Sequence, residues 1–268
     1  MGEIVQLAIA VTYATERLTC VKGVVMDRVL AVVEKAKAAF RERLNAISDR
    51  GGITKEMYIR YLSFQHHLTN GVQKHFLSCA SHPSMTNKRK LREFLFRFGL
   101  EEEPHFYVAE LDLRQLGCEP LPCPLDVALW WAYFDRIVVD RPFVRLGATC
   151  VLENLGAGAG GLGHDLLKNA PYLNKENTRF LQIHFHEVLP HGDQIIGALR
   201  SVRLQESEIS DLIEGANTGT ILYLRMANWA LGLDDLAREF PIELRTWRLK
   251  QNEPSFEFDL SVKGGQNP

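Results

Sequence analysis

Apolar side chains recur at intervals of three and four residues through most of this chain, which is the period of an amphipathic α-helix. Good helix formers fill these segments, and the sequence shows no sustained apolar–polar alternation of the kind that marks a half-buried strand. The pattern predicts helices over residues 24–48, 54–80, 88–117, 124–141, 143–156, 175–200, 206–231 and 233–248.

Residues that favour turns separate these segments. The run Asp49-Arg50-Gly51-Gly52 is a helix stop, and Thr54 suits the N-cap of the next helix. Because the connections are short and no linker divides the chain, we expect one all-α domain of roughly seven to nine helices over residues 1–250. Residues 251–268 lose the helical period and are expected to form a C-terminal tail.

Composition narrows the class of protein. Of the 268 residues, 46% are hydrophobic and 24% are charged, as in a globular protein, and the net charge of −2 indicates no basic surface for nucleic acid. No apolar run approaches the roughly 18 residues of a membrane span, and the N-terminus lacks a basic leader. The five cysteines are scattered, as reduced thiols are. We therefore expect a cytoplasmic protein, with a homodimer as the default assembly.

Ionisable residues interrupt the apolar stripes of two predicted helices. On segment 88–117 the stripe contains Glu102 and His105, which are three residues apart and so share a face. On segment 143–156 the stripe continues from its apolar members to Glu153. Carboxylates and imidazoles therefore take positions where the pattern otherwise places apolar side chains.

A third group lies in the stretch IHFHEVLPHGDQ, residues 183–194, where His184, Glu187 and His191 share one helical face. Buried carboxylates and imidazoles are costly unless they are compensated, so the six groups need a shared counter-charge. Two iron ions would supply it, and manganese would also fit, because carboxylate oxygens and imidazole nitrogens are usual ligands of both metals.

Two prolines bear on this hypothesis. Pro104 lies between Glu102 and His105, and Pro190 directly precedes His191. A proline interrupts the helical hydrogen bonds, so a helix that begins at Pro104 would exclude Glu102 and break the expected i, i+3 geometry. Alternatively, the kinks widen the space between the helices where a substrate would lie.

The run EEEPHFYVAELDLRQLG, residues 101–117, resembles the EE-x-x-H segment and the aspartate-leucine-x-x-leucine-glycine end of the haem-oxygenase-like iron-containing redox enzymes. That superfamily includes the TenA and PqqC proteins, and the resemblance implies a haem-oxygenase-like helical bundle with a labile diiron site. Its metal-binding members take ligands in the order glutamate, histidine; glutamate; histidine, acid, histidine. The matching residues are Glu102 and His105; Glu153; His184, Glu187 and His191.

The third helix departs from the commoner family spacing, histidine-x3-aspartate-x2-histidine. Val188 stands at the aspartate position, so Glu187 would have to serve as the acid. The spacing Glu187-x3-His191 is similar to that of the alkene-forming fatty-acid decarboxylase of the same family.

The resemblance also implies a function, which is the dioxygen-dependent oxidation of a small amphipathic metabolite by a non-haem diiron site. The reactions of the family are N-oxygenation, C–C cleavage and oxidative decarboxylation. Tyr61, His67 and His75 on segment 54–80 are the candidate substrate contacts. Tyr61 and His75 also share the apolar stripe of that segment, so both suit a place in the core.

Other hypotheses stay open at this point. The protein could be a metal-free binding or accessory protein of the same fold, with its acids paired to Arg145 or Arg179, or it could bind haem through His66 or His67. The run GAGGLG, residues 158–163, matches G-x-G-x-x-G, but no predicted strand precedes it. It therefore indicates a break or bend in a core helix more than a dinucleotide site.

Overall fold

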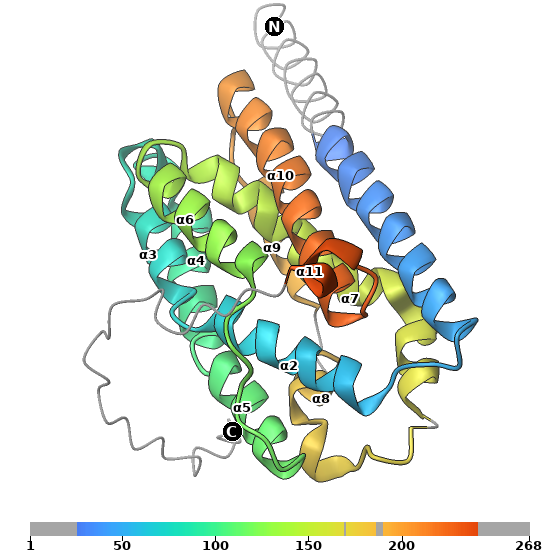
Figure 1. Ribbon diagram of the computed structural model, residues 1–268. Helices are drawn as coiled ribbons and strands as arrows, with labels where there is room; N and C mark the ends of the chain where they lie inside the picture. The colour runs from blue at the N-terminus through green and yellow to red at the C-terminus, as the bar shows by residue number, and fades with distance from the viewer. Residues whose placement is uncertain (1–25, 169, 186–189, 241–268) are drawn as a thin grey trace, which may run out of the picture.

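The computed structural model describes residues 26–168, 170–185 and 190–240, and of residues 156–165, 168, 184 and 185 it describes the backbone alone. Over these ranges the chain is helical and contains no strand (Figure 1), so the predicted all-α class is confirmed. The first helix covers residues 26–48. The others are α2 (Lys55–Thr69), α3 (Gln73–Ser81), α4 (Arg89–Glu102), α5 (His105–Gln115), α6 (Leu125–Asp140), α7 (Pro142–Lys168), α8 (Arg179–Phe185), α9 (His191–Arg200), α10 (Glu206–Ala230) and α11 (Asp235–Glu239), with short 3₁₀ turns at Pro83–Met85 and Lys175–Asn177.

Three segments predicted as single helices are each divided in two. Segment 54–80 begins as expected, with the Thr54 side chain accepting a hydrogen bond from the Met57 amide, but it breaks between α2 and α3 at Gly71. Gly71 has φ +84°, a backbone conformation that favours glycine. Segment 88–117 breaks at Pro104, whose missing amide ends the run of helical hydrogen bonds. In segment 175–200 the described residues form two α-helices, α8 and α9, and α9 begins directly after Pro190.

The predicted helix over 143–156 is longer than expected. As α7 it continues to Lys168, and its backbone stays helical through residues 158–163. The expected break at this glycine-rich run is therefore wrong. A dinucleotide-binding loop needs a strand before the glycines, and here they lie within a helix that already began at Pro142.

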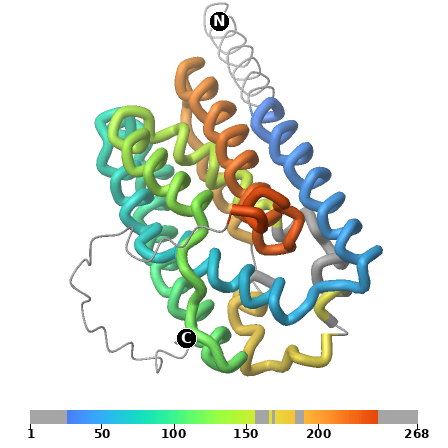
Figure 2. Tube along the Cα trace, viewed as in Figure 1, coloured from blue at the N-terminus to red at the C-terminus, as the bar shows by residue number. Residues whose placement is uncertain are grey.

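Helices α7 and α10 pack against each other more extensively than any other pair of described helices. The helix over residues 26–48 runs beside α10 (Figure 2), where the Phe40 and Tyr223 rings meet edge to face and Arg43 Nε donates to Asn228 Oδ1 at 2.6 Å. Trp130, Trp131 and Phe134 of α6 are fully buried in the same core cluster. These contacts fix α7, which carries Glu153, in the centre of the bundle.

A buried carboxylate holds the start of α8. Asp112 on α5 accepts a 2.8 Å hydrogen bond from the Phe180 amide, one of the unpaired donors at the N-terminus of that helix. Burial raises the pKa of Asp112 to about 6, although backbone hydrogen bonds from Phe180 and Arg179 oppose this shift. Asp112 therefore links α8, whose backbone includes His184, to the helix that begins at His105.

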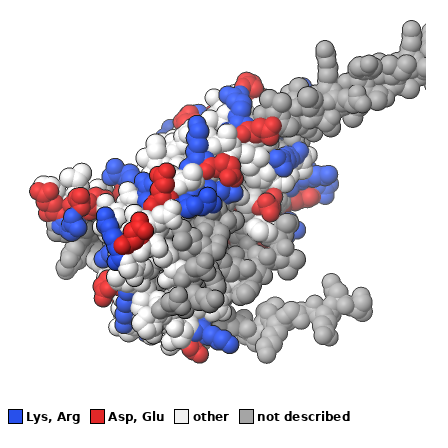
Figure 3. All heavy atoms as spheres, turned by 90° about the vertical axis from the view of Figure 1, so that its right-hand side faces the viewer, with Lys and Arg blue, Asp and Glu red and all other residues white. Residues whose placement is uncertain are grey.

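The described surface carries both signs of charge. On the face shown in Figure 3, lysine and arginine side chains are mixed with aspartate and glutamate rather than gathered in one basic area. None of the described helices combines the length and the apolar character that crossing a membrane requires. The predicted tail over residues 251–268 lies outside the described residues.

Candidate metal centre

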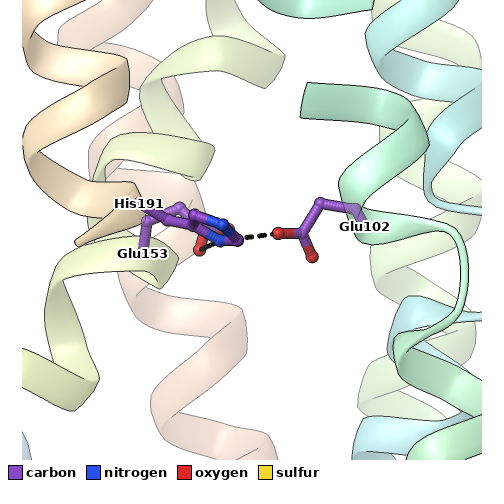
Figure 4. A group of neighbouring side chains, drawn as sticks. All are labelled: Glu102, Glu153 and His191. Carbon is purple, nitrogen blue, oxygen red and sulfur yellow. Dashed lines mark ion pairs between the residues drawn. The ribbon is translucent and has the colours of Figure 1, made fainter. Parts of the chain in front are cut away.

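Glu102, Glu153 and His191 converge from three different helices (Figure 4). One potential ligand atom from each lies within 4.8 Å of the others. Nδ1 of His191 lies 2.7 Å from Glu102 Oε1 and 3.6 Å from Glu153 Oε2. Two carboxylates and one imidazole at this spacing form a donor set that suits iron or manganese.

Glu102 and His105 remain together although their predicted common helix is interrupted. Glu102 is the last residue of α4, and His105 is the first residue of α5. Glu103 and Pro104 between them keep right-handed helical dihedral angles, so the chain completes one helical turn despite the proline. As a result, Nδ1 of His105 lies 2.7 Å from Glu102 Oε2.

His191 enters the site because α9 starts with it. Pro190 is the N-cap residue with an extended ψ of 139°, and His191 follows at the first helical position. A Cβ on Gly192 would lie 2.5 Å from the Asn154 amide oxygen, so with this orientation of the Asn154 side chain α9 approaches α7 closely at a glycine. Because Asn154 follows Glu153 in the chain, this contact brings His191 close to Glu153. Neither Gly192 nor Asn154 was predicted from the sequence.

The charges of the site are strongly coupled. Burial alone would raise the pKa of the Glu102 carboxyl, but the imidazoles of His105 and His191 outweigh it and hold that pKa well below its usual range. Burial alone would lower the pKa of His191, yet Glu102 and Glu153 together raise it to about 10. The pKa of His105 is raised against burial by Glu102 in the same way. Without metal, protonated imidazoles thus compensate the buried carboxylates.

The six predicted ligands fall into three groups. Glu102, Glu153 and His191 share the cluster, and His105 adjoins it through Glu102, with its ring centroid 6.2 Å from that of His191. His184 lies on α8, but its side chain is outside the described part of the structure. Glu187 also lies outside the described residues.

A cavity of about 440 Å³ opens beside the cluster, a volume typical of small-molecule sites. Glu102, Glu153 and His191 lie on its wall, together with the buried Arg145. Most of the remaining wall is apolar or aromatic, with side chains that include Phe64, Leu68, Phe76, Trp130, Phe180 and Tyr223.

The three predicted substrate contacts occupy different places. Tyr61 lines the cavity, stacks on Tyr58 and meets Phe180 edge to face, and burial raises its pKa to about 12. His67 and His75 are not among the described residues that line this cavity. Nε2 of His67 lies 2.7 Å from the Leu121 carbonyl oxygen, and the buried His75 is hydrogen-bonded to the exposed Asp135 and to the buried Arg145.

The hydrogen bonds of His75 define its protonation state. Arg145 Nε can only donate, so Nδ1 of His75, 3.1 Å away, is the acceptor. Nε2 then carries the proton and donates to Asp135 Oδ1 at 2.8 Å. Burial is the main reason why the pKa of His75 falls to about 4, and Arg145 adds to the effect against the opposing influence of Asp135. His75 is therefore a neutral imidazole at neutral pH.

This neutral histidine predicts an acid-sensitive fold. The folded state resists protonation of His75 down to about pH 4, whereas the unfolded chain takes up the proton near pH 6.5, so stability falls as the pH decreases through this window. Between pH 7 and pH 5, the wild type should lose about 2 kcal/mol of unfolding free energy more than His75→Gln. Urea denaturation of both proteins at the two pH values measures this difference, and equal losses would contradict it.

The comparisons with known proteins support the fold. No model of a known protein family matches the sequence, and no curated protein is similar to it. Among solved structures, the chain is similar to a domain of unknown function with a haem oxygenase-like fold from Shewanella denitrificans OS217, with a TM-score of 0.61 and 17% sequence identity. The match covers 87% of this chain and 97% of that domain. The haem-oxygenase-like fold expected from the sequence is therefore confirmed.

Proposed function

We propose that this protein is a non-haem diiron oxidase or oxygenase, which uses dioxygen to oxidise a small amphipathic metabolite. The observation that carries the proposal is the convergence of Glu102, Glu153 and His191 on one wall of a largely apolar cavity within a haem-oxygenase-like fold. Carboxylate and imidazole ligands suit iron, and manganese is the closest substitute.

Under this proposal the metal would be held by four residues whose positions the structure describes, which are Glu102, His105, Glu153 and His191. His184 and Glu187 complete the ligand set predicted from the sequence. Bound iron supplies the binding and reductive activation of dioxygen. The two imidazoles give up their protons when they become ligands, because only a neutral ring nitrogen binds a metal.

The cavity contributes binding and orientation. Its aromatic and aliphatic wall removes water from the apolar part of a ligand, while the charged side chain of Arg145 and the metal-binding cluster lie on the same cavity wall. A ligand with one polar end and an apolar body would therefore present its polar end near the cluster. This arrangement supports an amphipathic substrate.

The two rival hypotheses have less support. Glu102 is engaged by His105 and His191 rather than by Arg145 or Arg179, so the arginine pairing expected of a metal-free binding protein is not seen at this carboxylate. Haem binding would need His66 or His67 to face an open pocket. Instead, one ring nitrogen of each contacts a backbone carbonyl oxygen, and neither residue is among the described residues that line the cavity.

Oxygen uptake tests the proposed activity. Protein reconstituted anaerobically with ferrous iron should consume dioxygen faster when a suitable amphipathic acid, amine or amino acid is added from a panel of metabolites. Glu153→Ala should abolish the stimulated uptake, because it removes a ligand of the cluster. Uptake that is equal in the wild type and the variant for every compound would contradict the proposal.

A further inference from the structure

Arg145 is a cation in the centre of the fold. Its side chain is 1% exposed and lies over the rings of Phe76, Trp130 and Phe134, with the guanidinium carbon 5.1, 5.3 and 5.5 Å from the three ring centroids. Nε donates to His75, and Nη1 donates to Thr149 Oγ1 at 2.6 Å. Within the described part of the chain, Nη2 donates no hydrogen bond.

No carboxylate of the described residues neutralises this guanidinium directly. Among the described residues no acid lies within ion-pair distance of Arg145, and Asp135 reaches it only through the neutral ring of His75. Burial lowers the pKa of Arg145 to about 10, against the influence of Glu153 and Glu102, so the group is still charged at neutral pH. A buried charge without a close partner among the described residues is costly, and an anionic ligand in the adjoining cavity would offset that cost.

The position of Arg145 shows where that partner would lie. Arg145 lines the same cavity as Glu102, Glu153 and His191. The Glu102 carboxylate lies 2.7 Å from the rings of His105 and His191, and neither Glu102 nor Glu153 lies within ion-pair distance of Arg145, so the guanidinium is a separate positive charge on the cavity wall. One anionic group on a ligand would neutralise it, whereas a dianion would leave a buried negative charge of its own.

We infer that Arg145 anchors the carboxylate of the ligand, and that the cavity takes monocarboxylic acids with an apolar chain or ring. The carboxylate accepts a hydrogen bond from Nη2, and the apolar body packs among side chains such as Tyr61, Phe64 and Leu68. This inference rests on the proposed function, because it names the substrate class of that site. Arg145 is here a binding residue, while Glu102 and Glu153 hold the metal.

Calorimetric titration of the metal-free full-length protein with octanoate and with octanamide tests the inference. The two compounds have the same chain and differ in charge, and the absence of metal removes iron as a competing site for the carboxylate. Octanoate should bind roughly tenfold more tightly or better, since charged hydrogen bonds are much stronger than neutral ones. If the wild type binds octanoate and octanamide with equal affinity, the inference is overturned, and this result needs no variant.

Two variants separate anchoring from a purely structural role. Arg145→Met should bind octanoate as weakly as octanamide, while its affinity for octanamide stays close to that of the wild type. The control Arg141→Met, which removes an arginine paired with Asp211 and Glu214, should keep the preference for octanoate. A preference that survives in Arg145→Met, or an equal loss of affinity for both compounds, would overturn the anchoring role.

Iron binding by the same wild-type preparation is measured separately. Iron uptake without a preference for octanoate would overturn the anchor and leave the proposed function standing. A preference for octanoate without iron uptake would overturn the proposed function and support Arg145 as the anion site.

Discussion

Gly215→Ala should lower the free energy of unfolding by at least about 3 kcal/mol, because α7 and α10 touch through their backbones at this position. A Cβ built on Gly215 would overlap the Val144 carbonyl oxygen and lie 2.6 Å from the carbonyl carbon. Gly147 on α7 meets the Leu212 carbonyl in the same way. Backbone atoms cannot turn aside as a side chain can, so the helices would have to separate.

Gly197→Ala is the matched control for this prediction. Gly197 lies within α9, and a Cβ added there meets no atom within 4 Å. The same substitution should therefore raise the stability by about 0.5–1 kcal/mol, since alanine favours the helix more than glycine does. Urea denaturation measures both changes. A loss of less than about 1 kcal/mol in Gly215→Ala would contradict the close contact of the two helices.

Glu102→Gln should remove two properties at once. In the metal-free protein, the variant leaves His105 and His191 without the carboxylate that lies 2.7 Å from each ring, and losing one partner of a buried pair costs about 3–5 kcal/mol. In the presence of iron, the variant should also lose tight metal binding, because an amide is a much poorer ligand than a carboxylate.

Thermal unfolding with and without ferrous iron under nitrogen measures this second effect. Iron should stabilise the wild type by about 2.7 kcal/mol when it is present at a hundred times its dissociation constant, and it should leave Glu102→Gln unchanged. The control is Glu103→Gln, since Glu103 is one residue away and accepts a hydrogen bond from Gln73 instead. An equal iron-dependent shift in wild type and Glu102→Gln would exclude Glu102 as a ligand.

The helical period was enough to predict the fold class, because the described elements are helices and the long ones bury an apolar face. It was less reliable for helix ends. The stripe of segment 54–80 stays in register on both sides of Gly71, so the period alone does not reveal that the chain turns there. In the opposite case, glycines 158, 160 and 161 indicated a break, yet the backbone of α7 stays helical through them.

Only part of the candidate site could be predicted from the sequence. Glu102, Glu153 and His191 stood out because charged residues occupied positions of an apolar stripe, and these three do converge. Sequence spacing carries no information on which helices touch, so the contact between Gly192 and Asn154 could not be predicted. The one sequence feature consistent with a close approach of helices at His191 is the small residue that directly follows it, Gly192.

The contacts of Arg145 could not all be predicted from the sequence either. In the hypothesis of a metal-free protein, Arg145 is one of two arginines expected to pair with the buried acids. The structure instead places its hydrogen bonds on His75 and Thr149. The contact with Thr149 follows from the i, i+4 spacing within α7, whereas the contact with His75 depends on how α3 packs against α7 and cannot be read from the period of either helix.

Iron binding by Glu102, Glu153 and His191 can be measured directly by metal analysis. Wild type and Glu153→Ala would be incubated anaerobically with excess ferrous iron, freed of loosely bound metal by gel filtration and measured for iron per chain. We expect about two irons per chain in the wild type, as a diiron site requires, and clearly less iron per chain in Glu153→Ala. A wild type that retains no more iron than Glu153→Ala would contradict it.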